Sequence, residues 1–446
     1  MRKSTLLLNI FFTVLCTSAV AQTNFSGGIF SNTTWTVANS PYIITGSVVV
    51  FPNVTLTIQP GVVVKFQEKS YNTSEQIYLE VRGKLHAKGT NLQPISFIPE
   101  SAPTLGTDHI WQGILVKTAL GGSIELDYFT LNNSYYGLSY DDVLLDTLTF
   151  NECKFSYNSY TLSVNTNFVL NKCEFYNNAI INSLMYVYGS VKAKDCIYKN
   201  NYFCMASVLN GVSLENCTFE NTIASCFVQI SGSFKNCTFK NNNTVFREIG
   251  TIEIDSCTFL NNEIAIDGAS DGKIRNSIFK NNILALSVGA NSIVEKNDIS
   301  NNSVGLALIG KFTNGMVLPF IKENTICYNT LYNLENKSDY NLGLENNCFC
   351  LKDSLSIDQK IYDGYDDITR GLINFAVYDS LCLSIVQRVI KINLNTGVSI
   401  ELKTLNLYPN PFTDKINLNV DDSNILWSVV DITGKTVYET TNHKNS

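Results

Sequence analysis

The sequence predicts an all-β fold, a right-handed parallel β-helix of about twelve coils stacked along one axis. Three observations predict it: the segment Asn236–Asn242 recurs along the chain, cysteines recur at equivalent places, and pairs of asparagines follow the same repeat. Successive cysteines are 20, 23, 21, 20 and 20 residues apart, and a fixed period of this size indicates stacked supersecondary units. These cysteines are Cys153, Cys173, Cys196, Cys217, Cys237 and Cys257.

Each repeat has the pattern of three short strands separated by turns. In one repeat, Phe234, Cys237 and Phe239 are expected to point into the core, and the residues between them point outward or form a bend. Alternation of this kind is typical of strands. Asparagine tolerates the left-handed backbone conformation of tight bends, and its side chain can bond nearby backbone. We therefore expect the asparagine pairs to form a column of amides bonded from coil to coil; they lie at 177–178, 200–201, 241–242, 261–262, 281–282 and 301–302.

The cysteine column is expected to be a ladder of free, buried thiols. The chain has 13 cysteines, and an exported protein with many cysteines often forms disulfides, so a ladder of disulfides is the alternative. A free cysteine behaves as a small buried hydrophobe, which suits a position that stacks on its own kind. Outside the ladder, a bridge from Cys348 or from Cys350 to Cys382 could close the end of the stack.

The chain divides into four segments. Residues 1–21 have the pattern of a secretory signal peptide, with Arg2 and Lys3 before an apolar run and Ala19-Val20-Ala21 as the cleavage box. Residues 22–385 are assigned to the β-helix, 386–403 to a linker and 404–446 to a separate C-terminal domain. No later segment approaches the roughly 20 apolar residues of a membrane-spanning helix, so no membrane span is expected.

Several motifs resemble the pectate-lyase-like superfamily of right-handed parallel β-helices. Thr55–Phe66, Gly83–Thr90 and Trp111–Ile114 are similar to the opening coils of such proteins, and Ile361–Asp367 is similar to a closing coil. The resemblance implies the fold over most of the chain. It also raises the cleavage of polyuronates as an activity to examine.

The C-terminal domain resembles the sorting domain that type IX secretion systems recognise. The motif consists of Tyr408, Pro409, Asn410 and Pro411, and the later segment Val430–Val437 contains Gly434. In that family a small β-sandwich directs the protein across the outer membrane, so the resemblance implies the type IX machinery as a partner. It also implies a location outside the cell or on its surface, reached through the periplasm. The family's last strand and basic end are missing, so we expect an incomplete β-sandwich.

One acid–base pair emerges when the repeats are aligned: Arg247 is placed beside Asp267. Polyuronate cleavage requires a basic side chain and a carboxylate cluster, which commonly binds calcium. No cluster in the sequence offers the 6–8 oxygens that calcium prefers, so no cofactor or metal is predicted, although calcium is the ion to test. A cross-coil salt bridge worth less than ~1 kcal/mol is the alternative interpretation of this pair.

Tyr135, Tyr136 and Tyr140 are candidate carbohydrate-stacking residues, with packing of turns as the alternative. The net charge of −7 without a basic cluster argues against a nucleic-acid partner. We therefore favour an exported, non-enzymatic scaffold that binds extracellular polysaccharide or acts in adhesion. A polysaccharide lyase or hydrolase and a purely structural surface protein are the alternatives.

Overall fold

The computed structural model forms two compact units, Met1–Ser380 and Leu381–Ser446. The signal segment 1–21 and the linker 386–403 lie outside the described residues, as do Pro409, Asn410, Pro411 and Gly434. The residues that the structure describes are 22–68, 76–101, 111–141, 147–163, 166–178, 189–206, 211–247, 250–310, 316–380, 382, 407–408, 417–418, 427–430 and 436–440.

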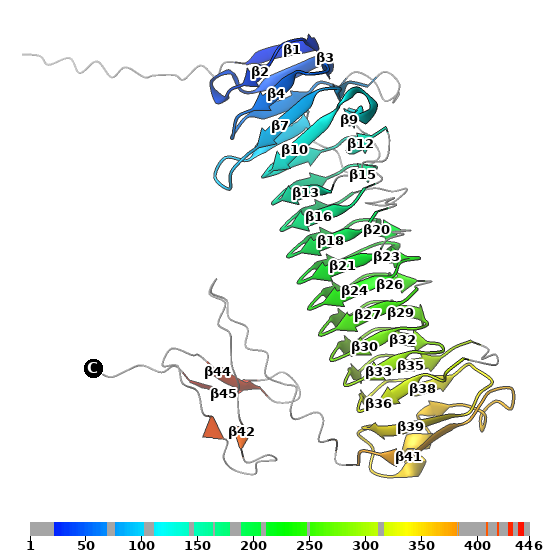
Figure 1. Cartoon of the computed structure of the whole chain (residues 1–446). Coiled ribbons are helices and arrows are strands. Elements are labelled where there is room, and N and C mark those ends of the chain that lie inside the picture. The colour runs from blue at the N-terminus through cyan, green and yellow to red at the C-terminus, as the bar shows by residue number, and fades with distance from the viewer. Residues whose placement is uncertain are drawn as a thin grey trace, which may run out of the picture. The chain divides into compact units, whose positions relative to one another are not determined.

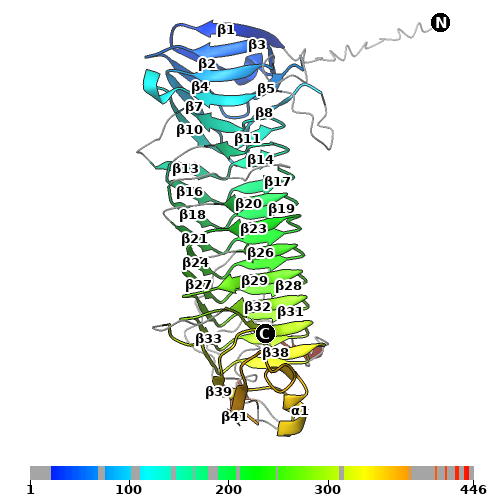
Figure 2. The same cartoon turned by 90° about the vertical axis from the view of Figure 1, so that its right-hand side faces the viewer.

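The first unit is a parallel β-helix, as the sequence predicts, and its strands stack on three faces (Figures 1 and 2). The first face is a 15-stranded parallel sheet, and many of the coils are only about 20 residues long. Its strands are β2 (Thr33–Trp35), β4 (Thr55–Ile58), β7 (Lys84–Lys88), β10 (Ser123–Asp127), β13 (Leu148–Asn151), β16 (Phe168–Asn171), β18 (Val191–Lys194), β21 (Val212–Glu215), β24 (Gly232–Lys235), β27 (Ile252–Asp255), β30 (Lys273–Arg275), β33 (Ile293–Glu295), β36 (Phe320–Lys322), β39 (Leu342–Asn347) and β41 (Ile373–Tyr378).

The second face follows the first in most coils, after a short turn. Its strands are β1 (Thr23–Ile29), β3 (Tyr42–Val50), β5 (Val63–Phe66), β8 (Ile95–Pro99), β11 (Phe129–Asn132), β14 (Lys154–Ser156), β17 (Glu174–Tyr176), β19 (Ile197–Lys199), β22 (Thr218–Glu220), β25 (Thr238–Lys240), β28 (Thr258–Leu260), β31 (Ile278–Lys280), β34 (Asp298–Ser300) and β37 (Thr325–Cys327).

The third face completes most of the coils that the structure describes. Its strands are β6 (Tyr78–Val81), β9 (Gly113–Val116), β12 (Leu138–Tyr140), β15 (Leu162–Ser163), β20 (Phe203–Ala206), β23 (Ser225–Val228), β26 (Thr244–Arg247), β29 (Ile264–Ala269), β32 (Leu284–Val288), β35 (Val304–Leu308), β38 (Tyr332–Asn336) and β40 (Ile361–Tyr362). Helical turns are short: η1 (Val37–Asn39), η3 (Thr118–Leu120) and α1 (Ser354–Asp358). No helix in the described part of the chain is long and apolar enough to cross a membrane.

Aromatic rings stack along the interior behind the second face. Phe219, Phe239 and Phe259 occupy the same place in successive coils, with ring centroids 5.2 and 4.8 Å apart. All three are fully buried, which confirms the inward register of the repeat. The stack continues through Phe155, Phe175, Tyr198 and Phe279.

The predicted asparagine column is confirmed between the second and third faces. In each pair the first asparagine has a left-handed backbone, with φ of 56° at Asn241, and the second is buried. Asn242 donates its backbone N–H and its side-chain Nδ2 to Oδ1 of Asn262, at 2.9 and 3.0 Å. The same Nδ2 also donates to the Phe219 carbonyl at 3.1 Å. The Asn242 amide thus satisfies two backbone groups of the preceding coil, the Thr222 N–H and the Phe219 carbonyl, and bonds the Asn262 amide of the next coil.

The six ladder cysteines are free thiols in the structure, and all are buried. Cys237 Sγ lies 3.7 Å from the Leu214 carbonyl and 3.4 Å from the Lys235 carbonyl. A hydrogen bond with Cys173 and burial raise the pKa of Cys196 to about 12. Because the thiolate is the reactive form, this shift keeps that thiol protonated and inert.

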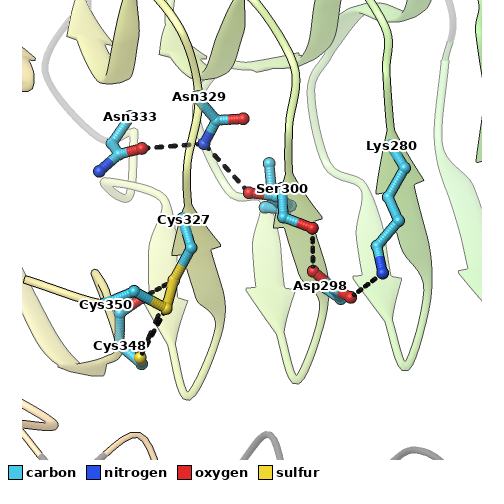
Figure 3. Close-up of a disulfide and its surroundings, with 9 residues drawn as sticks. Lys280, Asp298, Ser300, Cys327, Asn329, Asn333, Cys348 and Cys350 are labelled. Carbon is cyan, nitrogen blue, oxygen red and sulfur yellow. Dashed lines mark hydrogen bonds and ion pairs between the residues drawn. A yellow bond between two sulfur atoms is a disulfide. The ribbon is translucent and has the colours of Figure 1, made fainter. Parts of the chain in front are cut away.

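A disulfide joins Cys327 to Cys350 near the end of the stack (Figure 3). This pairing corrects the Cys350–Cys382 alternative. Cys348 and Cys382 are also disulfide-bonded, which agrees with the other alternative. Cys348 Sγ lies 3.7 Å from Cys350 Sγ, so three of the sulfur atoms are packed together.

The second unit contains two short antiparallel pairs. β42 (Leu407–Tyr408) pairs with β43 (Asn417–Leu418), and β44 (Trp427–Val430) pairs with β45 (Thr436–Thr440). Tyr408 of the sorting motif lies on the first of these strands.

Charges alternate along the outward edge of the first face. Lys235 on β24 is flanked in register by Glu215 on β21 and Asp255 on β27. Opposite charges on adjacent strands stabilise a sheet, and like charges destabilise it. The full column is Lys194, Glu215, Lys235, Asp255, Arg275, Glu295, Lys322 and Glu345.

We expect Phe239→Ala to lower the free energy of unfolding by ~3–5 kcal/mol, because it removes one ring from a fully buried stack. Chemical denaturation monitored by far-ultraviolet circular dichroism measures the loss. Lys240→Ala, at the next and exposed position of the same strand, is the control. Equal midpoints for wild type and Phe239→Ala would contradict the inward register.

We expect Lys235→Glu to destabilise the helix by roughly 0.5–2 kcal/mol, because it creates like-charge pairs with Glu215 and Asp255. Lys235→Gln removes the cation without adding repulsion and should cost less. In ~1 M salt, where the Debye length is ~3 Å, the two variants should converge. A difference between the two variants that is insensitive to salt would argue against the charge ladder.

Candidate functional site

Arg247 and Asp267 lie opposite each other in the register of β26 and β29, as the aligned repeats place them. Arg247 is exposed and Asp267 is half-buried. Asp267 accepts a hydrogen bond from the Ser287 hydroxyl at 3.2 Å, and that hydroxyl accepts one from the Gly268 N–H at 2.8 Å. No ion pair joins Arg247 to Asp267 among the described residues. The carboxylate therefore contributes to a hydrogen-bonded link between coils.

Metal-ligating side chains do not gather around Arg247. In the part of the chain that the structure describes, the one group of three such residues close enough to hold an ion is Cys327, Cys348 and Cys350. Two of these form the disulfide. The described residues around Arg247 thus offer no carboxylate cluster of the kind that holds calcium at a polyuronate-cleaving site.

The predicted tyrosines are separated by the fold. Tyr135 and Tyr136 pack together with Tyr160, with centroids 4.6 Å apart for the first pair and 5.3 Å for Tyr135–Tyr160. Tyr136 is exposed, at 37%, and Tyr135 and Tyr160 are half-buried. Tyr140 instead packs against the core, where burial raises the pKa of its hydroxyl above the ordinary value.

A groove of about 620 Å³ lies on the first face, where the sequence analysis placed no site. It crosses the starts of β18, β21, β24, β27 and β30, a distance of about 19 Å at a strand spacing of ~4.8 Å. Serine, threonine and glycine make up half of its lining residues. The lining comprises Ser190, Val191, Lys192, Gly211, Val212, Ser213, Ser231, Gly232, Ser233, Thr251, Ile252, Glu253, Asp271 and Lys273.

Small residues create the hollow. Ser213 and Ser233 occupy the outward positions of adjacent strands, and their hydroxyls are 3.3 Å apart. Gly232 is required by close packing, because a Cβ atom there would lie 2.1 Å from the Val212 carbonyl oxygen. The neighbouring coils carry longer side chains, so the floor is depressed between Lys192 on one side and Glu253 and Lys273 on the other.

The ends of the groove carry available positive charge. Lys192 and Lys273 are exposed, and neither forms an ion pair among the described residues. The nearby carboxylates have partners: Glu253 contacts Arg275 at 3.4 Å, and Asp271 accepts a hydrogen bond from Asn291 at 2.7 Å. The groove therefore offers hydroxyl groups along its floor and an ammonium group at each end.

This site had a signal in the sequence that was not used. Lys192, Ser213, Ser233, Glu253 and Lys273 form one outward column in register. The alignment of repeats that places Arg247 beside Asp267 on the third face also places these five residues in one column of the first face. Two serines on adjacent strands of this column, with long charged side chains on either side, indicate a depression in the surface.

A second polar cluster lies nearer the N-terminus on the same face. Glu125 on β10 contacts Lys84, His86 and Lys88 of β7, with 3.0 Å to His86 Nδ1 and 3.3 Å to Lys88 Nζ. The hydrogen bond from Lys84, followed by that from Lys88, lowers the pKa of Glu125 to about 2. These partners neutralise one another, so we interpret the cluster as a cross-strand ion network.

The comparison with protein families identifies the C-terminal unit. Residues 406–446 match the secretion system C-terminal sorting domain. This match confirms the predicted sorting tail, with Tyr408, Pro409, Asn410, Pro411 and Gly434 inside the matched range. It indicates export through the type IX secretion system to the cell surface or the extracellular space. The secretion machinery is thereby a partner of the chain.

The remaining comparisons concern the β-helix. No curated protein matches the chain. Among solved structures, the A-module of mannuronan C-5 epimerase AlgE4 from Azotobacter vinelandii is similar at 12% identity and a TM-score of 0.34, over 73% of this chain and 90% of that one. A mannuronic acid specific polysaccharide family 6 lyase from human gut microbiota is similar at 12% identity and a TM-score of 0.29, over 71% and 82% of the two chains.

The Glu125 network generates a prediction for acid stability. The folded pKa is lowered from 4.5 to about 2, so the stabilisation is complete above the unfolded pKa and is lost as the pH falls through the range between these values. Wild type should therefore melt higher than Glu125→Gln at neutral pH, and this advantage should shrink between about pH 4.5 and pH 2. Thermal unfolding of both proteins across this range measures it. An advantage that grows on acidification would contradict the assignment.

Proposed function

We propose that the protein is an exported, non-enzymatic scaffold that binds an extended carbohydrate in the groove on the first face. The observation that carries the proposal is the row of Ser213, Gly232 and Ser233 between Lys192 and Lys273. Sugars present many hydroxyl groups, which pair well with serine hydroxyls and exposed backbone groups. The two ammonium groups favour a chain that carries carboxylate or sulfate groups.

The length of the groove supports a polymeric ligand. It runs across successive strands, and the strand spacing of ~4.8 Å is close to the ~5 Å length of one sugar unit. A linear glycan lying along the helix axis would meet an equivalent backbone position about once per unit. The groove of about 19 Å then accommodates three to four sugar units.

A non-enzymatic role is favoured by the placement of the acid–base pair. Arg247 and Asp267 lie on the third face, whereas the groove lies on the first. A chain bound in the groove would therefore not meet this pair. A lyase or hydrolase remains as an outcome of the experiment below.

We expect the mature protein to retain one or more polysaccharides on an array of neutral and acidic glycans, with or without added calcium. A double variant, Ser213→Tyr with Ser233→Tyr, should fill the groove and weaken binding at least about tenfold, which corresponds to about 1.4 kcal/mol. Thr238→Tyr places the same side chain outward on the second face of one of these coils and is the matched control.

Other outcomes would contradict the proposal in different ways. Release of unsaturated chain ends would establish a lyase, and loss of that activity in Arg247→Gln would locate it. Equal binding by wild type and the groove variant would exclude the groove. A complete lack of binding would favour a purely structural surface protein.

A further inference from the structure

An exposed apolar patch begins where the groove ends. The exposed fractions are 50% for Met316, 66% for Val317, 37% for Leu318 and 45% for Phe320. These residues are consecutive in the sequence except for the buried Pro319. Exposed apolar side chains that gather in one place mark interaction sites more often than isolated ones do. We call these four residues the apolar patch.

The patch continues the floor of the groove. Phe320 on β36 pairs in register with Ile293 on β33, and Ile293 pairs with Lys273 of the groove. The outward column therefore runs from the serines through Lys273 and Ile293 to Phe320. These side chains share one face and one line parallel to the helix axis.

Hydrogen bonds fix the patch to the rim of the groove. Asn291 donates to Asp271 of the groove lining at 2.7 Å, and its Oδ1 accepts the Val317 N–H at 3.1 Å. The Asn291 N–H in turn donates to the Val317 carbonyl at 2.8 Å. The two surfaces are thus joined through Asn291, which holds the patch in place relative to the groove.

The ring of Phe320 remains accessible in this arrangement. The Lys322 ammonium lies 5.0 Å from the ring centroid. Lys322 pairs in register with Glu345 on the next strand, β39. Gly343, two residues before Glu345, is therefore the position opposite Phe320. A Cβ built there would have no atom within 4 Å, so the space beside Phe320 is open. An aromatic ring with an open side can stack against the apolar face of a sugar ring.

We propose that the apolar patch, with Phe320 at its centre, is a stacking subsite that extends the groove, so that the ligand is a linear glycan longer than the groove itself. This inference rests on the carbohydrate-binding function proposed above. From β18 to β36 the combined surface spans about 29 Å, which corresponds to roughly six sugar units. The polar groove would bind the hydroxyl and charged groups, and the patch would bind the apolar face of a terminal ring.

The test is a length series of linear oligosaccharides, from about two to about eight units, in acidic (oligouronate) and neutral (cello-oligosaccharide) forms. Calorimetric titration of the full mature protein should show a further increase in affinity for chains that are long enough to extend beyond the groove. In Phe320→Ala, affinity for the long chains should fall about fivefold to tenfold, and affinity for chains of three units should not change. Phe30→Ala removes another exposed ring, at 72% exposure in the first coil, and should change nothing.

Phe320→Trp supplies a second readout, because tryptophan keeps the aromatic platform and reports on its surroundings. Its affinity for long chains should match or exceed that of wild type, and its fluorescence should change with long chains only. Equal binding of every length by Phe320→Ala and wild type would overturn this inference while leaving the groove intact. A wild-type protein that binds neither series would overturn the inference together with the proposed function.

Discussion

The buried side-chain amides between the second and third faces are the constraint on which the β-helix depends. The chain must bend from one face to the next within two or three residues at this turn, which places backbone groups in the interior where water cannot reach them. A buried backbone group without a partner is costly, and an asparagine such as Asn242 supplies partners for two backbone groups of the preceding coil while its Nδ2 bonds the amide of the next coil. The spacing of Asn242, Asn262 and Asn282 therefore fixes the coil length at this turn. Because the coil length is fixed, the aromatic rings and thiols fall into register as well.

Much of this fold could be predicted from the sequence because the repeat is nearly invariant between 150 and 310. Phe239 and Cys237 alternate with polar residues over so short a span that only a strand accommodates them. The turn asparagines were informative because few residues tolerate a left-handed backbone. The pairing of Cys327 with Cys350 could not be predicted, since it depends on how the last coils deviate from the repeat.

The candidate site was harder to predict because outward residues carry no periodic constraint. Arg247 and Asp267 were placed correctly in register, yet register alone does not tell whether two side chains meet, and Asp267 turns to Ser287 instead. The tyrosines were grouped by their proximity in sequence, but Tyr140 lies on a strand where its ring packs against the core. The groove depends on the absence of side-chain volume at Ser213, Gly232 and Ser233. Missing volume is difficult to recognise in a sequence, where attention goes to residues with reactive groups.

The separation of inward and outward residues has a consequence for how such a protein can change. Contacts run mainly between a coil and its two neighbours, and the core of each coil is filled by side chains that never reach the surface. Surface residues on one face can therefore be replaced with little effect on folding. Duplication or loss of one complete coil would leave the remaining interfaces matched and would alter the binding surface by one strand. The natural unit of variation for this molecule is then the coil, and ligand length could be adjusted in steps of about one sugar unit.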